Sequence, residues 1–403
     1  MAGHEHELHM LTEMLSAGHL SSFVQLPDLV AGHAARAGMD DARIFLADLR
    51  QQVLREVTGR GHAAGDGGEV YDVDRTLPGR AFADTRPLPD EDRQTRRWWV
   101  PILNGTERLG VLRVDLADGL GSDSANALAS LVGLLLVSKR PHSDSYARLL
   151  RTEAMTVAAE MQWNLMPPRS FANRDVVLTA AMEPAYAIGG DAFDHAAAGH
   201  QVHLAIFDAM GHDSRAGLTA NLAVAACRNQ RRQDADLLTT GEKVEDVLVE
   251  HFGHDTYVTA VLAVLDATTG VLSWTNYGHP PPVLIRGGRW VTTLQCPPAH
   301  PRGTELGIAA TVCREQLEPA DRVLLYTDGV TEARDSRGRE FGLASFIELV
   351  IRHHADGLTA PETLRRLMRA VLDHHDGRPA DDATVLCLEW HGPSRNLELR
   401  PTP

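Results

Sequence analysis

The C-terminal half of the chain alternates short apolar runs with amphipathic stretches. Uninterrupted apolar runs of roughly four to eight residues between polar or Gly-rich segments predict buried strands. Such runs occupy residues 176–181, 202–207, 257–266, 271–277, 322–327 and 383–388. Apolar residues recurring every three or four positions predict helices over 214–228, 242–252, 344–354 and 360–374. Hairpin turns are expected at Thr268-Thr269-Gly270 and Gly287-Gly288, so the pattern predicts antiparallel sheets with their faces covered by helices.

The N-terminal half shows a separate alternation. It predicts a helix over 26–37, a strand over 42–49, a Gly-rich segment over 59–68, strands over 98–102 and 109–114 joined by a turn at Asn104-Gly105, and a helix over 125–137. This order, together with the segment 77–82, resembles a GAF domain, which is an α/β sensor unit. The resemblance implies either a small-molecule ligand, whose identity the residues do not give, or a role in dimerisation.

A helical segment is expected between the two halves. Leu150, Ala154, Val157 and Met161 recur at spacings of 4, 3 and 4, which is typical of a heptad seam, and Pro167-Pro168 ends the helix. Two interpretations stay open: the helix packs on its own C-terminal domain, or it pairs with a second copy in a homodimer. The expected boundaries are a sensor domain at 1–140, a helical linker at 141–168, a C-terminal domain at 169–391 and a tail at 392–403.

Acidic residues stand at the ends of the predicted strands. Asp191 follows Gly189-Gly190, and the other strand-end acids are Asp208, Asp328, Asp381 and Asp382. Buried carboxylates repel one another and resist desolvation, so a group of them is expected to be neutralised by cations. Hard oxygen donors suit Mg²⁺ or Mn²⁺. Each acid alone would be read as a turn residue or a helix cap, but their joint pattern favours a metal site.

Six short motifs occur in a fixed order along this half. They are residues 187–194, 207–212, 257–260, 276–282, 326–333 and 381–384. Together they resemble the sporulation-type branch of the metal-dependent (PPM) serine/threonine phosphatases, over roughly residues 160–391. The resemblance implies a layered α-β-β-α sandwich.

The resemblance also implies roles for individual residues. Asp191 and Asp208 would act through a water shared by two or more Mn²⁺ or Mg²⁺ ions, with Asp191 bridging the ions. Asp328, Asp381 and the carbonyl oxygen of Ala209 would complete the metal site, with Asp382 as an alternative to its neighbour or as a residue that orients the loop. The implied activity is hydrolysis of phosphoserine or phosphothreonine in a protein, an anti-sigma-factor antagonist, under control of the N-terminal domain.

Departures from the family pattern support a second hypothesis, a ligand-sensing interaction protein with a degenerate, weakly active phosphatase fold. Asp213 replaces a residue that is small in the family, and it would either hold a third ion or disturb the start of the following helix. Asn276 to Pro282 is interpreted as a structural turn that buries His279, with a general acid as the alternative role. The spacing of Cys296 and Arg302 fits cysteine-based phosphatases, but three of the five residues between them are prolines, which have no N–H to bind phosphate.

Composition narrows the remaining classes of function. The net charge of −15 argues against a nucleic-acid partner, which demands a positive surface. The four cysteines show no CxxC pair, so reduced thiols are expected, with neither a disulfide framework nor a zinc site. No apolar run is long enough to span a bilayer, and a cytoplasmic location without membrane attachment is expected.

Overall fold

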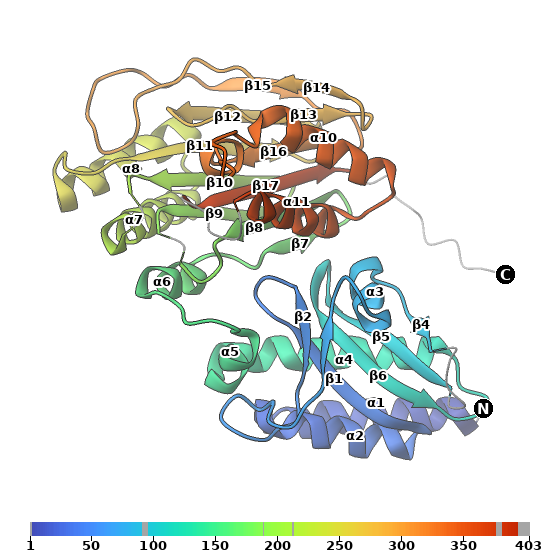
Figure 1. The fold of residues 1–403 in the computed structure, drawn as a ribbon. Helices are drawn as coiled ribbons and strands as arrows, with labels where there is room; N and C mark the ends of the chain where they lie inside the picture. The colour runs from blue at the N-terminus through green and yellow to red at the C-terminus, as the bar shows by residue number, and fades with distance from the viewer. Residues whose placement is uncertain (1, 91–95, 188, 212, 376–380, 394–403) are drawn as a thin grey trace. The chain divides into compact units, whose positions relative to one another are not determined.

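A computed structural model describes residues 2–90, 96–187, 189–211, 213–375 and 381–393 (Figure 1). The chain divides into two compact units, Met1–Ala154 and Met155–Pro403. Each unit has its own sheets and its own apolar core, and each is described by itself. Within the described ranges, no helix has the length and apolar content needed to cross a membrane.

The first unit is built on one antiparallel six-stranded sheet. Its strand order is β3 (Val70–Asp72), β2 (Val53–Glu56), β1 (Met39–Ala47), β6 (Glu107–Leu116), β5 (Arg97–Asn104) and β4 (Leu88–Pro89). Strand β1 alternates between two cores: Ile44 and Leu46 face α2 (Leu26–Arg36), α4 (Ser122–Lys139) and α1 (Ala2–Gly18), whereas Phe45 and Ala47 face α3 (Leu77–Asp84). The period of two therefore places an apolar core on both faces of the sheet.

The predicted elements of this unit are found. The helices over 26–37 and 125–137 correspond to α2 and α4, and the Asn104-Gly105 turn joins β5 to β6, with Gly105 at a φ of 61°. The sequence pattern did not predict α1, α3 or the short strands β2, β3 and β4. These strands are only two to four residues long, too short for a period-two pattern to stand out.

The predicted continuous linker helix is wrong. The 3-10 helix η2 (Arg140–His142) and helix α5 (Asp144–Leu150) are followed by residues without helical structure, and α6 (Val157–Leu165) begins afresh, with the Thr156 hydroxyl accepting a hydrogen bond from Ala159 N. Leu150 packs on the core of the first unit, while Val157 is 70% exposed. The apolar positions therefore do not form one seam, and the heptad spacing no longer supports a coiled coil.

The second unit contains two antiparallel sheets. The five-stranded sheet has the order β15 (Cys313–Gln316), β12 (Val271–Tyr277), β11 (Val258–Asp266), β10 (Gln201–Ala209) and β9 (Asp191–Ala198). The six-stranded sheet has the order β14 (Trp290–Thr293), β13 (Val283–Arg286), β16 (Asp321–Tyr326), β17 (Ala383–Trp390), β8 (Val176–Glu183) and β7 (Ser170–Ala172).

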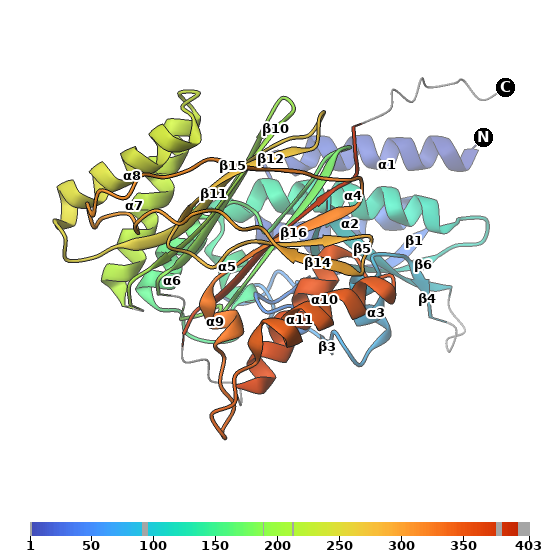
Figure 2. The same cartoon turned by 90° about the horizontal axis from the view of Figure 1, so that it is seen from above.

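Helices cover the outer face of each sheet, as Figure 2 shows. Helices α7 (Ser214–Arg231) and α8 (Leu237–Phe252) pack on the five-stranded sheet, and α10 (Gly342–Ala355) and α11 (Ala360–His374) pack on the six-stranded sheet. The core between the sheets includes Phe193, Ile206 and Leu386, all fully buried. The predicted α-β-β-α sandwich is confirmed. Strand β9, which starts at Asp191, was missed because Phe193 is the one large apolar residue in its sequence.

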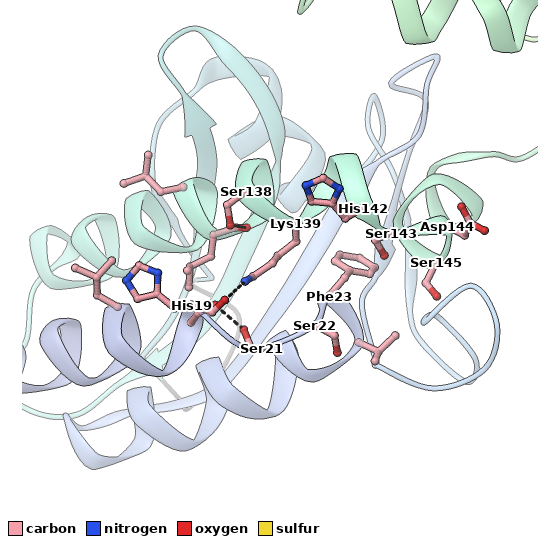
Figure 3. A pocket seen from close by; sticks show the side chains of 15 residues that line it. His19, Ser21, Ser22, Phe23, Ser138, Lys139, His142, Ser143, Asp144 and Ser145 are labelled. Carbon is pink, nitrogen blue, oxygen red and sulfur yellow. Dashed lines mark hydrogen bonds between the residues drawn. The ribbon is translucent and has the colours of Figure 1, made fainter.

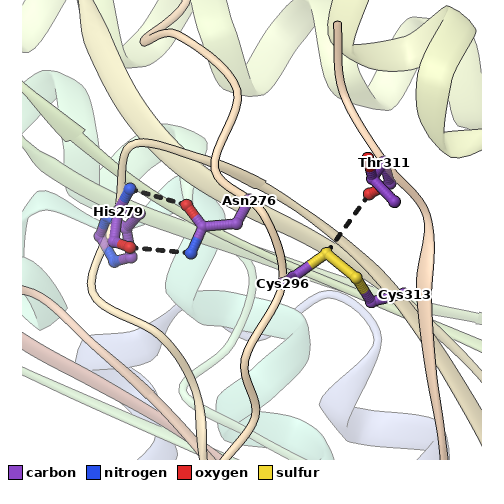
Figure 4. Close-up of a disulfide and its surroundings, with 5 residues drawn as sticks. All are labelled: Asn276, His279, Cys296, Thr311 and Cys313. Carbon is purple, nitrogen blue, oxygen red and sulfur yellow. Dashed lines mark hydrogen bonds between the residues drawn. A yellow bond between two sulfur atoms is a disulfide. The ribbon is translucent and has the colours of Figure 1, made fainter.

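The expectation of four reduced thiols is wrong for one pair. Cys296, in the loop after β14, forms a disulfide with Cys313 at the start of β15, with Cα atoms 5.8 Å apart (Figure 4). The pair is separated by 17 residues, so no local spacing signals it. Cys227 and Cys387 are free and buried.

Candidate active site

Two of the predicted acids lie opposite each other on neighbouring strands. In the antiparallel β9–β10 pair, Asp191 at the start of β9 is the register partner of Asp208 near the end of β10. Residues directly opposite on one pair of strands bring their Cβ atoms to roughly 4.5–5.5 Å. Asp191 is 2% exposed and Asp208 is partly exposed, so one carboxyl group is buried and its partner faces the rim of the site.

The remaining acids come from the other sheet. Asp328 begins the short helix α9 (Asp328–Thr331) that follows β16, and Asp381 lies two positions before the first residue of β17. Strands β16 and β17 are antiparallel neighbours, so the end of one and the start of the other meet at the same edge. Asp328 and Asp381 both act electrostatically on Asp208, so acids of the two sheets lie within range of one another's charges.

A tight loop sets the position of Asp191. Asp382 Oδ2 accepts hydrogen bonds from the amides of Gly189, Gly190 and Asp191, at 2.7, 2.6 and 3.3 Å. A Cβ on Gly190 would lie 2.5 Å from the carbonyl oxygen of Ala209, so only glycine allows this close approach. Asp382 therefore has the loop-orienting role, while the Ala209 carbonyl packs beside the loop that carries Asp191.

Burial and mutual repulsion hold these carboxyl groups towards the protonated form. Burial, followed by the charges of Asp208 and Asp382, raises the pKa of Asp191 well above its ordinary range. Burial raises the pKa of Asp208 to about 7, with Asp328, Asp381 and Asp382 adding to the rise. Burial also raises the pKa of Asp328, with Asp381 contributing. A cation placed among these groups would remove the repulsion that causes the shifts.

The donor chemistry at this edge fits a divalent metal ion. In the part of the chain that the structure describes, no three side chains of His, Cys, Asp or Glu converge closely enough to enclose one ion. The side chains on offer are nevertheless all carboxylates, with the Ala209 carbonyl nearby, which is the oxygen set that Mg²⁺ and Mn²⁺ prefer. Magnesium in proteins typically retains several waters, so few protein ligands per ion are compatible with it.

A cleft opens beside the acids. It has a volume of about 260 Å³, and its lining includes Asp328 and Asp381, Glu332, the basic residues Arg334 and His375, and the small residues Gly329 and Ala333. A Cβ on Gly329 would lie 1.9 Å from the carbonyl oxygen of Asp382, so a glycine is required at the floor of this cleft.

His279 has the structural role that was expected. It is 4% exposed, and burial lowers its pKa to about 3, so the imidazole is neutral. Nε2 lies 3.0 Å from the carbonyl oxygen of Tyr326, which can only accept, so Nε2 carries the hydrogen and Nδ1 accepts from the Thr259 hydroxyl at 2.8 Å. The side chain of Asn276 makes two hydrogen bonds to the main chain of His279: Nδ2 donates to the carbonyl oxygen, and Oδ1 accepts from the amide (Figure 4). The residue thereby joins the two sheets next to Asp208, whose register partner is Thr259.

The structure also bears on the remaining points of the sequence hypothesis. Asp213 Oδ1 accepts hydrogen bonds from the amides of Arg215 and Ala216 and caps α7, so the suggestion that it disturbs this helix is wrong. His212, the last residue of the motif 207–212, lies outside the described residues. The cysteine-phosphatase alternative fails because Cys296 is in a disulfide, while the Arg302 guanidinium stacks 4.2 Å from the centre of the Tyr277 ring.

The sequence hypothesis missed three residues that hold the site in place. Thr327 Oγ1 donates to Asp191 Oδ2 over 2.7 Å, and Gln162 Nε2 donates to Gly189 O over 3.1 Å. Asp194, at 1% exposure, forms ion pairs with Arg228 and Arg231 and fixes β9 to α7. Thr327 stands inside the motif 326–333, so its side chain could have been singled out; Gln162 carries no sequence signal.

The first unit holds a separate groove of about 750 Å³ (Figure 3). Its apolar wall includes Leu15, Phe23 and Leu135, and its polar rim is formed by His19, Ser21, Ser22, Ser138, Lys139, His142, Ser143, Asp144 and Ser145. Lys139 Nζ donates to the carbonyl oxygen of His19 over 3.2 Å. The groove therefore combines an apolar wall with basic and hydroxyl groups.

Comparison with known proteins shows what the second unit is similar to. Residues 198–391 match the family described as Stage II sporulation protein E (SpoIIE). This segment therefore resembles a SpoIIE-type phosphatase domain. The match includes Asp208, Asp328 and Asp381 and begins seven positions after Asp191, which lies on the strand paired with β10. The resemblance inferred from the motifs is thus confirmed for the matched residues.

Individual relatives of the SpoIIE-type domain are distant. Protein IcfG of Synechocystis sp. is 26% identical over 143 residues, which are 35% of this chain and 22% of that protein. The structure of the RsbU and RsbW domains of Rv1364c from Mycobacterium tuberculosis is 25% identical with a TM-score of 0.48, covering 55% of this chain and 63% of that one. The phosphatase domain of SpoIIE from Bacillus subtilis, with a fragment of its regulatory domain, is 21% identical with a TM-score of 0.45, covering 55% and 64%. The chain spans less than two thirds of each of these relatives.

Proposed function

We propose that the second unit is a Mn²⁺- or Mg²⁺-dependent protein phosphatase that hydrolyses phosphoserine and phosphothreonine. The observation that carries the proposal is that Asp191 and Asp208 pair on the five-stranded sheet, while Asp328 and Asp381, at the ends of strands in the six-stranded sheet, act electrostatically on Asp208. A structural role gives no reason to collect four acids whose charges oppose folding. A site for divalent cations does, because the cations offset that repulsion.

In this proposal Asp191 and Asp208 would hold the divalent ions, and Asp328, Asp381 and the Ala209 carbonyl would complete the set of ligands. When bound, such a pair lowers the pKa of a water and holds phosphoryl oxygens for in-line attack. Asp382 keeps Asp191 in place through the three amides of its loop. His279 is neutral and buried, so we give it no proton-transfer step.

The cleft beside Asp328 and Asp381 is proposed to receive the phosphorylated segment of the substrate. Arg334 lines the same cleft, and its guanidinium would offset the negative charge of the phosphoryl group. Arg334 is already bonded to Glu340 and to the carbonyl oxygen of Gly338, which fixes its direction. The substrate itself is proposed to be a phosphorylated anti-sigma-factor antagonist, on the strength of the sporulation-type motifs and the SpoIIE-family match.

The first unit is proposed to be a GAF-like regulatory domain. Its antiparallel sheet with helices on both faces is consistent with that assignment, and the groove in Figure 3 offers a place for a small molecule. We also propose a cytoplasmic location. In that reducing compartment the Cys296–Cys313 disulfide would be exposed to thiol reductants.

The test is phosphate release by the full-length protein from phosphoserine and phosphothreonine peptides, with Mn²⁺, with Mg²⁺ and with EDTA. We expect turnover with either ion, loss of turnover in EDTA, and recovery when the ion is restored. A protein that binds Mn²⁺ but releases no phosphate from any substrate would favour the alternative, an interaction protein with a degenerate phosphatase fold. A protein that binds neither ion would refute the metal site.

A further inference from the structure

Thr327 lies where a helix cap is normally found, but its side chain is used elsewhere. It is the N-cap residue of α9, and its hydroxyl makes no hydrogen bond to that helix. Threonine at an N-cap usually accepts a hydrogen bond from an amide of the first helical turn. Here Thr327 is fully buried, and its hydroxyl points to a residue of the opposite sheet, Asp191.

Two hydrogen bonds fix the direction of the hydroxyl. The amide of Thr384 donates to Thr327 Oγ1 over 2.9 Å, which occupies an acceptor position of that oxygen. The hydroxyl hydrogen is then directed to Asp191 Oδ2 over 2.7 Å. The amide of Thr327 donates to the carbonyl oxygen of Thr384 over 3.0 Å, so the two threonines are joined by main chain and side chain. A side chain held in this way cannot rotate without breaking a buried hydrogen bond.

The position of this hydroxyl gives it a specific effect. It lies between β16, which leads into Asp328, and β9, which begins with Asp191. It therefore sets the orientation of the Asp191 carboxylate relative to the acids of the other sheet. Groups that hydrogen-bond a metal-ligating carboxylate orient it, and their loss typically weakens metal binding.

We propose that Thr327 is a positioning residue that holds the Asp191 carboxylate in the orientation needed to bind a divalent cation. This inference rests on the proposed function, since the cation is the one that Asp191 would hold. It assigns to the threonine of the motif 326–333 a role that is separate from that of the neighbouring acid Asp328. The competing explanation is that Thr327 only fastens the two sheets together.

Three variants of the full-length protein separate these explanations. Thr327→Val keeps the shape of the side chain and removes the hydroxyl, while Thr327→Ser keeps the hydroxyl. Thr179→Val is the matched control: Thr179 is also buried in the six-stranded sheet, on β8, and within the described residues its hydroxyl has no hydrogen-bond partner. Thr179 pairs with Cys387, four register positions along the strands from the pair Ala383–Glu183, which lies next to Asp381 and Asp382.

Mn²⁺ binding is measured by isothermal titration calorimetry, and urea unfolding is followed in EDTA. We expect Thr327→Val to raise the Mn²⁺ dissociation constant by about 10-fold or more, with Thr327→Ser and Thr179→Val within about threefold of the parent. The Mn²⁺ concentration for half-maximal turnover should shift in parallel. If Thr327→Val does not fold, Thr327→Ala is measured by the same criteria.

The outcomes are distinct. Parental Mn²⁺ affinity in Thr327→Val, with or without a lower urea midpoint, would overturn the positioning role and leave only a structural one. An equal loss of affinity in Thr327→Ser would also overturn it, because the hydroxyl is retained there. A parent protein that binds no Mn²⁺ would instead refute the proposed function, and this inference would fall with it.

Discussion

Gln162 and Gly189 are joined by a buried hydrogen bond in which the side-chain Nε2 of Gln162 donates to the main-chain oxygen of Gly189 over 3.1 Å. Gln162 is fully buried on α6, and Gly189 begins the loop that leads into Asp191. On its other side this loop is held by Asp382. The loop is therefore fixed between α6 and the start of β17, and movement of either would displace Asp191.

The first prediction concerns this bond. Gln162→Leu removes the donor and leaves Gly189 O buried without it, which should lower the free energy of unfolding by about 1–3 kcal/mol. We also expect a higher Mn²⁺ requirement for turnover, because the loop that carries Asp191 loosens. Asn164→Leu, two residues further along the same helix, is the control, since Asn164 is exposed and its side chain bonds to Glu160 within the helix. Equal Mn²⁺ requirements in the two variants would contradict the coupling.

The second prediction contrasts two buried aspartates of β9. Asp191→Asn should abolish metal-dependent turnover without lowering stability in EDTA, because it removes a carboxylate that Asp208 and Asp382 repel. Asp194→Asn should instead lower the free energy of unfolding by about 3–5 kcal/mol, because it breaks the buried ion pairs to Arg228 and Arg231. Urea unfolding in EDTA and phosphate release with Mn²⁺ test both variants. Retained turnover in Asp191→Asn would remove this residue from the metal site.

The third prediction concerns the disulfide. Replacing Cys296 and Cys313 together by serine opens a loop spanning 17 residues and should lower the free energy of unfolding by about 3 kcal/mol. Turnover with Mn²⁺ should stay near the parental value, because neither cysteine is among the residues proposed to bind the metal ions. Thiol counting under denaturing conditions checks the pairing, with two free thiols expected before reduction and four after it. Loss of turnover with the fold intact would revive a catalytic role for Cys296.

The fourth prediction follows from His279, whose pKa is about 3 in the folded protein against an ordinary value of 6.5. The unfolded chain takes up the proton first, so this residue costs stability as pH falls from 6.5 towards 3, about 2 kcal/mol by pH 5. His279→Gln removes that dependence but not the contributions of other groups. Urea unfolding of both proteins between pH 5 and 7.5 should show a smaller acid-side loss in the variant. Parallel pH curves would mean that His279 is not buried in its neutral form.

The sequence pattern predicted antiparallel sheets covered by helices because each layer follows a local rule, and the family resemblance implied their arrangement as a sandwich. Strand 202–207 is a continuous apolar run and helix 360–374 repeats every three to four residues, so their burial is readable without knowing their partners. The acids could also be singled out from the sequence, because they stand where predicted strands end beside turns. Asp208 and Asp328 could therefore be assigned to one site before their sheets were known.

The residues that hold those acids could not be found in the same way. Gln162 and Gly189 are 27 positions apart, and Thr327 and Asp191 are 136 apart. Such pairs are set by how the two sheets and α6 pack, for which periodicity carries no information. The prediction of a continuous linker helix was wrong although its local pattern was clear. Leu150 and Val157 fit a helical spacing, but Leu150 packs on the core of the first unit and helix α5 ends there.

Strand β17 is flanked by β16 and β8 in the six-stranded sheet, although both precede it in the chain. Asp382, just before this strand, binds the amide of Asp191, a residue 191 positions earlier. A nascent chain emerging from the ribosome therefore has an open gap in this sheet and an unsupported Gly189-Gly190 loop until its last described strand has been made. An intermediate of translation that ends before β17 therefore lacks the contacts that hold Asp191, so the proposed metal site can be complete only after this strand has been synthesised.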